Sequence, residues 1–309
     1  MTLRSALLLL TVLLPAAAPA ALARTLEVGP GKPYKLPSEA IAAAGNGDRV
    51  LIAPGSYFDC AIVHQSNITI EGSDPAGGAA LTDKSCGGKG LLVISGHDVT
   101  IRNLTLTRAR VPDGNGAGIR AEGQNLTVEG VHFINNQDGI LAGMDGSTLI
   151  IRNSEFLRNG TCESGCAHGI YVGHMKLLRI EHSRFFETKQ AHHIKSRALR
   201  TEIIGCDIED GDKGTASYLI DIPNGGSLVV RGSTLQKGPL AENHTAAIIL
   251  GEEGVTQPTD EITIENNSFR NDGDYETAFV RNITATEAML HNNRLSGPVK
   301  PLVGDGEVN

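Results

Sequence analysis

A basic run near the middle of the chain carries most of the side chains that could do chemistry. In the segment HHIKSR, residues 192–197, basic side chains occupy every second position as His193, Lys195 and Arg197. Period-2 alternation in a β-strand would place these three on one outward face, each about 7 Å from the next. The formal net charge is −8, so such a local cluster is the natural place for an anionic ligand to bind.

Neighbouring segments of similar pattern bring other chemical groups to the same surface. Tyr171 and Asp221 are the equivalents of Lys195 in the preceding and following segments, so a phenol, an amine and a carboxylate lie in one series. His168 and His192 each stand two residues before an inward Ile, and they could point inward or lie at the strand entrance. We expect both to contact substrate.

The turns that follow add polar groups. Tyr218 and Asn224 flank Asp221, and Glu252 and Glu253 lie in the turn of the next segment. We expect Asp221 and Asn224 to contact substrate as well. Asp221 with either glutamate could hold Ca²⁺, because calcium prefers carboxylate oxygens. The alternative is that these residues only solvate the surface, with Lys195 and Asp221 forming an ion pair worth roughly 0 to 1 kcal/mol.

Together these groups suit β-elimination at a uronic acid. A base removes the proton beside the carboxylate, the carboxylate must be neutralised, and the leaving oxygen must be protonated. Lys195 or His193 could be the base, Arg197 the carboxylate clamp, and Tyr171 or Tyr218 the acid.

A sequence repeat positions these residues. Eight segments share an alternating strand, an Asn or Gly, and a closing Phe, Ile or Leu, at intervals of 23 to 34 residues. Their central residues are Ile101, Val128, Ile151, Ile180, Ile203, Val230, Ile264 and Leu290. Variable intervals, 37 glycines and no Trp suit coils of three short strands joined by loops of different length. The closing residues are expected to stack inside as an apolar ladder. The predicted fold is therefore all-β, a right-handed parallel β-helix with an N-terminal helical cap.

The chain ends are expected to be specialised. One positive charge, a short apolar run and an A-x-A site make residues 1–23 a secretory signal peptide, and no later stretch is apolar enough to span a membrane. Residues 24–57 are expected to form the cap, with a helical turn and a first strand at Arg49 to Ala53. We assign the β-helix to residues 58–296 and a loose tail to residues 297–309.

The five cysteines fit an oxidising compartment. Cys162 and Cys166 are close enough to bridge within one loop, Cys60 and Cys86 could tie neighbouring coils, and Cys206 is left over.

Residues 36–57, LPSEAIAAAGNGDRVLIAPGSY, resemble the N-terminal caps of pectate-lyase-like β-helix proteins, which often run helix, G-D-x-V, P-G-x-Y. With the ladders, the resemblance covers nearly all of the chain after the signal peptide, and it implies the fold.

HHIKSRALRTEIIGCDI, residues 192–208, is similar to a coil of alginate- and chondroitin-cleaving β-helix lyases, which implies that Lys195 is the base. Those lyases place an arginine one coil later, where this chain has Asp221. The run from KSRA to SYLIDIPNGG also resembles a group of exported bacterial β-helix proteins. The N-T-D, D-D, G-H-G and R-I-K set of motifs of polygalacturonases is absent, so the sequence favours β-elimination over hydrolysis.

We therefore predict an exported carbohydrate-active protein, periplasmic or secreted, that acts on an acidic polysaccharide. A β-eliminating lyase or a uronate epimerase fits best, since both reactions begin with the same proton abstraction. The alternative is a non-catalytic β-helix that binds a glycan or a surface partner. Net negative charge argues against nucleic acid, and we expect a monomer without membrane insertion, with Ca²⁺ as the one candidate cofactor.

Overall fold

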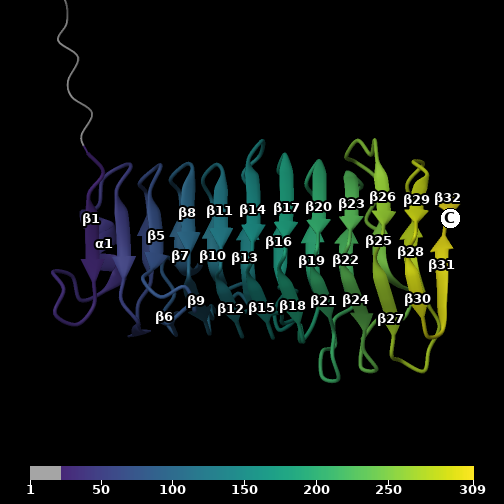
Figure 1. Cartoon of the computed structure of the whole chain (residues 1–309), viewed down its shortest axis with the longest axis horizontal. Helices are drawn as coiled ribbons and strands as arrows, with labels where there is room; N and C mark the ends of the chain where they lie inside the picture. Colours follow the sequence, from purple (N-terminus) through teal and green to yellow (C-terminus); the bar gives the residue numbers. More distant parts are fainter. Residues whose placement is uncertain (1–21) are drawn as a thin grey trace, which may run out of the picture.

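The computed structural model describes residues 22–309 as coils stacked along one axis, with the C-terminus at the far end of the stack (Figure 1). Each complete coil contributes a short strand to each of three parallel sheets, and every strand pairs with its equivalent in the neighbouring coils. The predicted parallel β-helix is confirmed. The predicted signal peptide falls on residues that lie almost wholly outside the described part of the chain.

Sheets 1, 2 and 3 are named in the order in which the chain visits them within a coil. Sheet 1 contains β1 (Thr25–Val28), β2 (Arg49–Ile52), β5 (Thr69–Gly72), β8 (Val99–Arg102), β11 (Leu126–Glu129), β14 (Thr148–Arg152), β17 (Leu177–Glu181), β20 (Arg200–Ile204), β23 (Ser227–Arg231), β26 (Ile262–Glu265), β29 (Ala288–His291) and β32 (Gly306–Val308). Sheet 2 contains β3 (Gly55–Tyr57), β6 (Ala79–Thr82), β9 (Leu104–Thr107), β12 (His132–Ile134), β15 (Glu155–Leu157), β18 (Arg184–Phe186), β21 (Asp207–Glu209), β24 (Thr234–Lys237), β27 (Ser268–Asn271) and β30 (Arg294–Ser296). Sheet 3 contains β4 (Ala61–Val63), β7 (Gly90–Ile94), β10 (Ala117–Ala121), β13 (Asp138–Ala142), β16 (Ile170–Val172), β19 (His192–Ser196), β22 (Tyr218–Ile222), β25 (Ala246–Leu250), β28 (Thr277–Asn282) and β31 (Val299–Val303).

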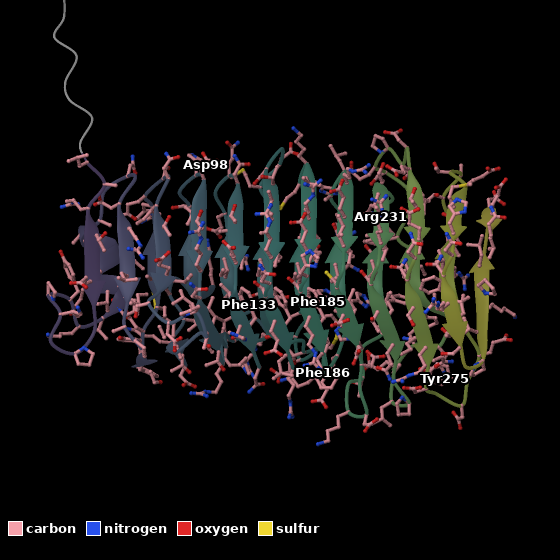
Figure 2. The ribbon with its side chains drawn as sticks, viewed as in Figure 1. Asp98, Phe133, Phe185, Phe186, Arg231 and Tyr275 are labelled. Atoms are coloured by element: carbon pink, nitrogen blue, oxygen red, sulfur yellow. A yellow bond between two sulfur atoms is a disulfide. The ribbon has the colours of Figure 1, made fainter. Side chains whose placement is uncertain are left out.

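The core consists of ladders of equivalent side chains. Phe133, Phe156 and Phe185 are fully buried, and their rings stack with centroids 4.5 Å apart; two of these rings are labelled in Figure 2. At the corner between sheets 1 and 2, Asn103 and Asn153 have φ values of 52° and 48°. Asn tolerates this left-handed conformation, which is why the repeat carries Asn or Gly at this position.

The two ends of the coil stack differ from the sequence-based expectation. Helix α1 (Pro37–Ala43) forms and packs against β4, but β1 precedes it, so Arg49 to Ala53 is not the first strand. At the other end, residues 297–309 are not a loose tail, because β31 pairs with β28 and β32 pairs with β29. Terminal strands are exposed on one edge, so their polar composition and Pro301 hid their strand character.

Both predicted disulfides, Cys60–Cys86 and Cys162–Cys166, are formed, and Cys206 is free and buried. Between residues 22 and 309, no helix is long and apolar enough to cross a membrane.

Candidate active site on sheet 3

The candidate site lies on the outer surface of sheet 3, where the strands do not alternate simply. In β22, Leu219 and Ile220 both belong to the main core, whereas Tyr218 belongs to a separate apolar cluster. The pairing of β19 with β22 joins His192 to Tyr218 and Ile194 to Ile220, and it skips the position between them. Outward residues before and after the Ile are therefore three positions apart, not two.

This interruption overturns the predicted role of His193. The ring is fully buried, and it hydrogen-bonds through Nε2 to Asp210 Oδ1 at 2.9 Å and through Nδ1 to Thr188 Oγ1 at 2.8 Å. His193 thus does not share the outward face with Lys195 and cannot reach a substrate as a base.

The sequence does contain a signal of the interruption. Gly118, Gly139 and Gly169 occupy the column of His193 in the three preceding coils. A Cβ at Gly118 would lie 2.8 Å from Phe133, and one at Gly139 would lie 2.8 Å from Phe156. Glycine before the inward Ile therefore marks a second position that faces the core.

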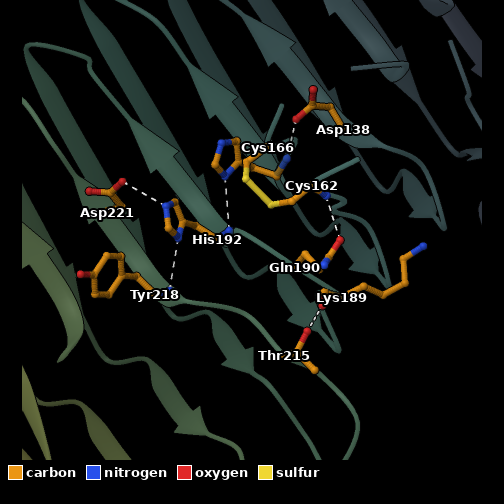
Figure 3. The surroundings of a disulfide bond; sticks show 10 residues. Asp138, Cys162, Cys166, Lys189, Gln190, His192, Thr215, Tyr218 and Asp221 are labelled. Atoms are coloured by element: carbon orange, nitrogen blue, oxygen red, sulfur yellow. Dashed lines mark hydrogen bonds and ion pairs between the residues drawn. A yellow bond between two sulfur atoms is a disulfide. The ribbon is translucent and has the colours of Figure 1, made fainter. Parts of the chain in front are cut away.

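His168, His192 and Tyr218 form a column on the outer face. The rings of His168 and His192 stack with centroids 4.9 Å apart, and the His192 and Tyr218 rings lie 5.2 Å apart. Figure 3 shows dashed lines from the His192 ring to Asp221 and to Tyr218, in the surroundings of the Cys162–Cys166 disulfide.

Both imidazoles of this column are neutral. Nδ1 of His168 accepts the backbone N–H of His192, and Nδ1 of His192 accepts that of Tyr218, each at 3.3 Å. Burial, helped by the charge of Lys195, lowers the pKa of His192 to about 3 and holds that of His168 well below its usual value. The remaining proton of His192 lies on Nε2, which is 3.4 Å from Asp221 Oδ2. His192 therefore has no free nitrogen to act as a base.

Lys195 lies beside two carboxylates. Its Nζ donates to Asp221 Oδ2 at 2.8 Å and to Glu253 Oε1 at 2.6 Å. Burial works against the ammonium, but these contacts outweigh it and raise the pKa of Lys195. Asp221 is 1 % exposed, and burial raises its pKa to about 6 although Lys195 opposes the shift. Its Oδ1 has no hydrogen-bond partner.

Arg197 connects Tyr171 to this group. Its Nε donates to the Tyr171 hydroxyl at 3.1 Å, Nη1 donates to Asn224 Oδ1, and Nη2 donates to Glu253 Oε2 at 2.8 Å. Burial disfavours the charge of Arg197, but its bonds to Tyr171 and Glu253 raise its pKa. The carboxylate of Glu253 is thus held jointly by Lys195 and Arg197.

The remaining predicted residues do not form a calcium site. Tyr218 donates its hydroxyl proton to Glu252 Oε1 at 2.9 Å, and burial raises the pKa of this phenol. Lys195 lies between Asp221 and Glu253, and Arg197 also binds Glu253, so the protein's own cations already neutralise these two carboxylates. Across residues 22–309, no group of three or more His, Cys, Asp or Glu side chains is placed to hold a metal ion. The residues therefore do not fit Ca²⁺.

Two hollows on the same face were missed from the sequence. One, of about 410 Å³, lies beside Tyr171 and is also lined by Arg120, Leu141 and Met144. Arg120 Nη1 has no hydrogen-bond partner. The other, of about 290 Å³, is lined by residues that include His244, Arg281 and Lys300. Arg281 pairs with Ile249, which pairs with Asp221, so Arg281 lies in the same outward column as Lys195.

Comparisons with known proteins agree with this architecture. A family model described as "Right handed beta helix region" matches residues 57–236. An alginate lyase from Paenibacillus sp. str. FPU-7 is similar in structure, with 20 % identity over 92 % of this chain and 99 % of that chain, and a TM-score of 0.68.

Pectate lyase Pel9A is 14 % identical over 90 % of this chain and 78 % of that chain, with a TM-score of 0.60. The pectin methylesterase of Aspergillus niger is 11 % identical over 92 % of this chain and 91 % of that chain, with a TM-score of 0.53. No curated protein sequence matches this chain. These similarities confirm the predicted right-handed parallel β-helix.

Proposed function

This chain belongs to the right-handed β-helix family, and we propose that it is an exported lyase that cleaves an acidic polysaccharide by β-elimination at a uronate residue. The observation that best supports this is the Glu253 carboxylate, which Lys195 and Arg197 hold at 2.6 and 2.8 Å. A uronate carboxylate needs the same charged donors. Two of the similar structures are named as an alginate lyase and a pectate lyase, which agrees with this class of reaction.

The reaction assigns one role to each outward group. Arg197 binds the substrate carboxylate and stabilises the charge that develops when the neighbouring C–H bond breaks. The free amine of Lys195 takes that proton, the electron pair forms a C=C bond, and the C–O bond to the leaving sugar breaks. Tyr171 gives its proton to the leaving oxygen. Tyr171 is better placed than Tyr218, because Arg197 donates to its oxygen while the Tyr218 proton is bound to Glu252.

Other residues of the cluster act as positioning residues. Asn224 fixes the guanidinium of Arg197, and the buried carboxylate of Asp221 fixes Lys195. The polymer would lie along the coil axis, with the hollow at Arg120 on one side and the hollow at Arg281 on the other. Each basic residue can then bind a further carboxylate of the chain.

The second candidate is a binding protein without turnover. It is favoured by the raised pKa of Lys195, because a lysine that keeps its proton can bind a carboxylate but cannot act as a base. Epimerisation starts with the same proton abstraction and differs in that C5 is reprotonated and the C–O bond stays intact.

The test is the ultraviolet absorbance of the unsaturated product during incubation with alginate, pectate, glucuronan and glycosaminoglycans. We expect one polymer to give a rise, and Lys195→Ala to reduce the rate by about 10³, the usual contribution of a general base. Lys176→Ala, at an exposed lysine in the loop between β16 and β17, serves as the control. A flat trace on every polymer, with an acidic polymer still bound, would favour an epimerase or a binding protein, because neither forms the unsaturated product.

A further inference from the structure

The loop that carries Glu252 and Glu253 already occupies the candidate site. Both oxygens of Glu253 accept bonds from the two cations, Lys195 and Arg197. We propose that Glu253 is an internal competitor of the substrate carboxylate, which must displace it to bind. The identity of the displacing ligand rests on the proposed function, whereas the internal contact does not.

The loop backbone is anchored, so the displacement requires only side-chain movement. Residues 251–261 join β25 to β26 and fold back over the turn that follows β22. The backbone N–H of Glu253 donates to Pro223 O at 2.9 Å, and Asn224 Nδ2 donates to Gly254 O at 3.1 Å. The Glu253 side chain is nevertheless 44 % exposed. It can therefore rotate into solvent while the loop stays in place.

The two carboxylates bound to Lys195 differ in how easily they can be replaced. The Asp221 side chain is 2 % exposed and lies under the surface, whereas Glu253 reaches Lys195 from the solvent side. Removing a buried partner leaves an unpaired buried charge, whereas an exposed partner is exchanged against water at little cost. Asp221 is thus the permanent partner of Lys195, and Glu253 is the exchangeable one.

This arrangement has a consequence for specificity. A ligand that brings a carboxylate replaces one anion by another, so the charge balance around Lys195 and Arg197 is kept. A neutral glycan would have to expel Glu253, which would leave Arg197 without an anion and Lys195 with Asp221 alone, and this is unfavourable. Glu253 therefore selects for acidic polymers and reduces their affinity.

The internal contact can be tested without any polysaccharide. The reaction of Lys195 with acetic anhydride is followed by peptide mass spectrometry in the wild type, in Glu253→Ala, and in Glu287→Ala, an exposed glutamate of the next coil. Losing Glu253 uncovers Nζ and removes one of the contacts that raise the pKa of Lys195, so acetylation should be several-fold faster. An unchanged rate overturns the proposal.

Competition is tested with hexamers of galacturonate and mannuronate, and with a neutral glucan hexamer, by titration calorimetry at constant ionic strength. An acidic hexamer should bind Glu253→Ala about ten-fold more tightly than the wild type or Glu287→Ala, and the neutral hexamer should show no change. Unchanged or weaker binding of an acidic hexamer overturns the proposal. Faster acetylation with no acidic hexamer bound by any variant would leave the internal contact standing and refute the proposed function for galacturonate and mannuronate polymers.

Discussion

Replacing Asp221 with asparagine should remove a pH-dependent cost from the folded state. The carboxylate is 1 % exposed, its Oδ1 has no hydrogen-bond partner, and burial raises its pKa to about 6. In the unfolded chain, an aspartate titrates at about 3.9. The folded protein therefore binds more protons than the unfolded chain between these two values.

The sign and size of the effect follow from this difference. Because the folded state holds the extra proton, the free energy of unfolding decreases as the pH rises from about 4 to about 6. Two pKa units correspond to about 3 kcal/mol. Below this pH range the Asp221 carboxyl is protonated in both states, and above it the carboxylate is ionised in both states. The contribution of Asp221 to the free energy of unfolding is therefore independent of pH outside this range.

The assay is urea unfolding of the wild type and Asp221→Asn at several pH values between about 4 and 7. The stability of the wild type minus that of the variant should fall by about 3 kcal/mol across the pH range from about 4 to about 6. Asp212→Asn, at an exposed aspartate, controls for loss of a surface charge. A difference that stays constant or rises with pH would refute the reasoning, since it would mean that the ion pair with Lys195 outweighs burial.

Three further outcomes are expected. Lyase kcat/KM should rise with pH above neutrality, because the carboxylates beside Lys195 outweigh burial and raise its pKa while the reaction needs the free amine; a falling profile would exclude Lys195 as the base. Lys237 is fully buried, and burial lowers its pKa to about 8. The free energy of unfolding of the wild type, relative to that of Lys237→Met, should therefore increase by about 3 kcal/mol as the pH rises from about 8 to about 10.4. Denaturant unfolding at alkaline pH measures this gain, and a flat difference would contradict it. Phe156→Ala removes the middle ring of an aromatic stack and should lower the free energy of unfolding by about 3 to 5 kcal/mol. Urea titration measures this loss, and a loss below about 1 kcal/mol would mean that the neighbouring rings move together and fill the cavity.

The fold could be predicted because a coil repeats the same physical requirements. An inward Phe such as Phe133 and a left-handed Asn such as Asn103 recur at equivalent positions, so each coil supports the interpretation of the next. The ends lack this support. Thr25–Val28 and Val299–Val303 have a neighbouring strand on one side only. Val299–Val303 contains no buried residue, and Thr25–Val28, although it alternates, has no preceding coil whose sequence it could repeat.

The site could be predicted in part. The column of Tyr171, Lys195 and Asp221 follows from the register, and the structure confirms the pairing. The predicted outward position of His193 was wrong, because simple alternation does not describe a strand in which two consecutive residues face the core. The hydrogen bond that Lys195 donates to Glu253 could not be predicted. It depends on how the loop after β25 folds back over the preceding coil, and no local sequence pattern encodes that loop conformation.

The three-residue spacing of outward positions turns the outer surface of sheet 3 into an array with two columns. Each coil adds one row, such as His168 with Tyr171 or His192 with Lys195, and successive rows are about 4.8 Å apart. Since each coil contacts only its neighbours, a coil duplicated between β10 and β13 would add a row beside Arg120 and leave the rows of the candidate site unchanged. If the proposed function holds, the length of polymer that this surface binds can change with the number of coils, independently of the chemistry proposed for the central rows.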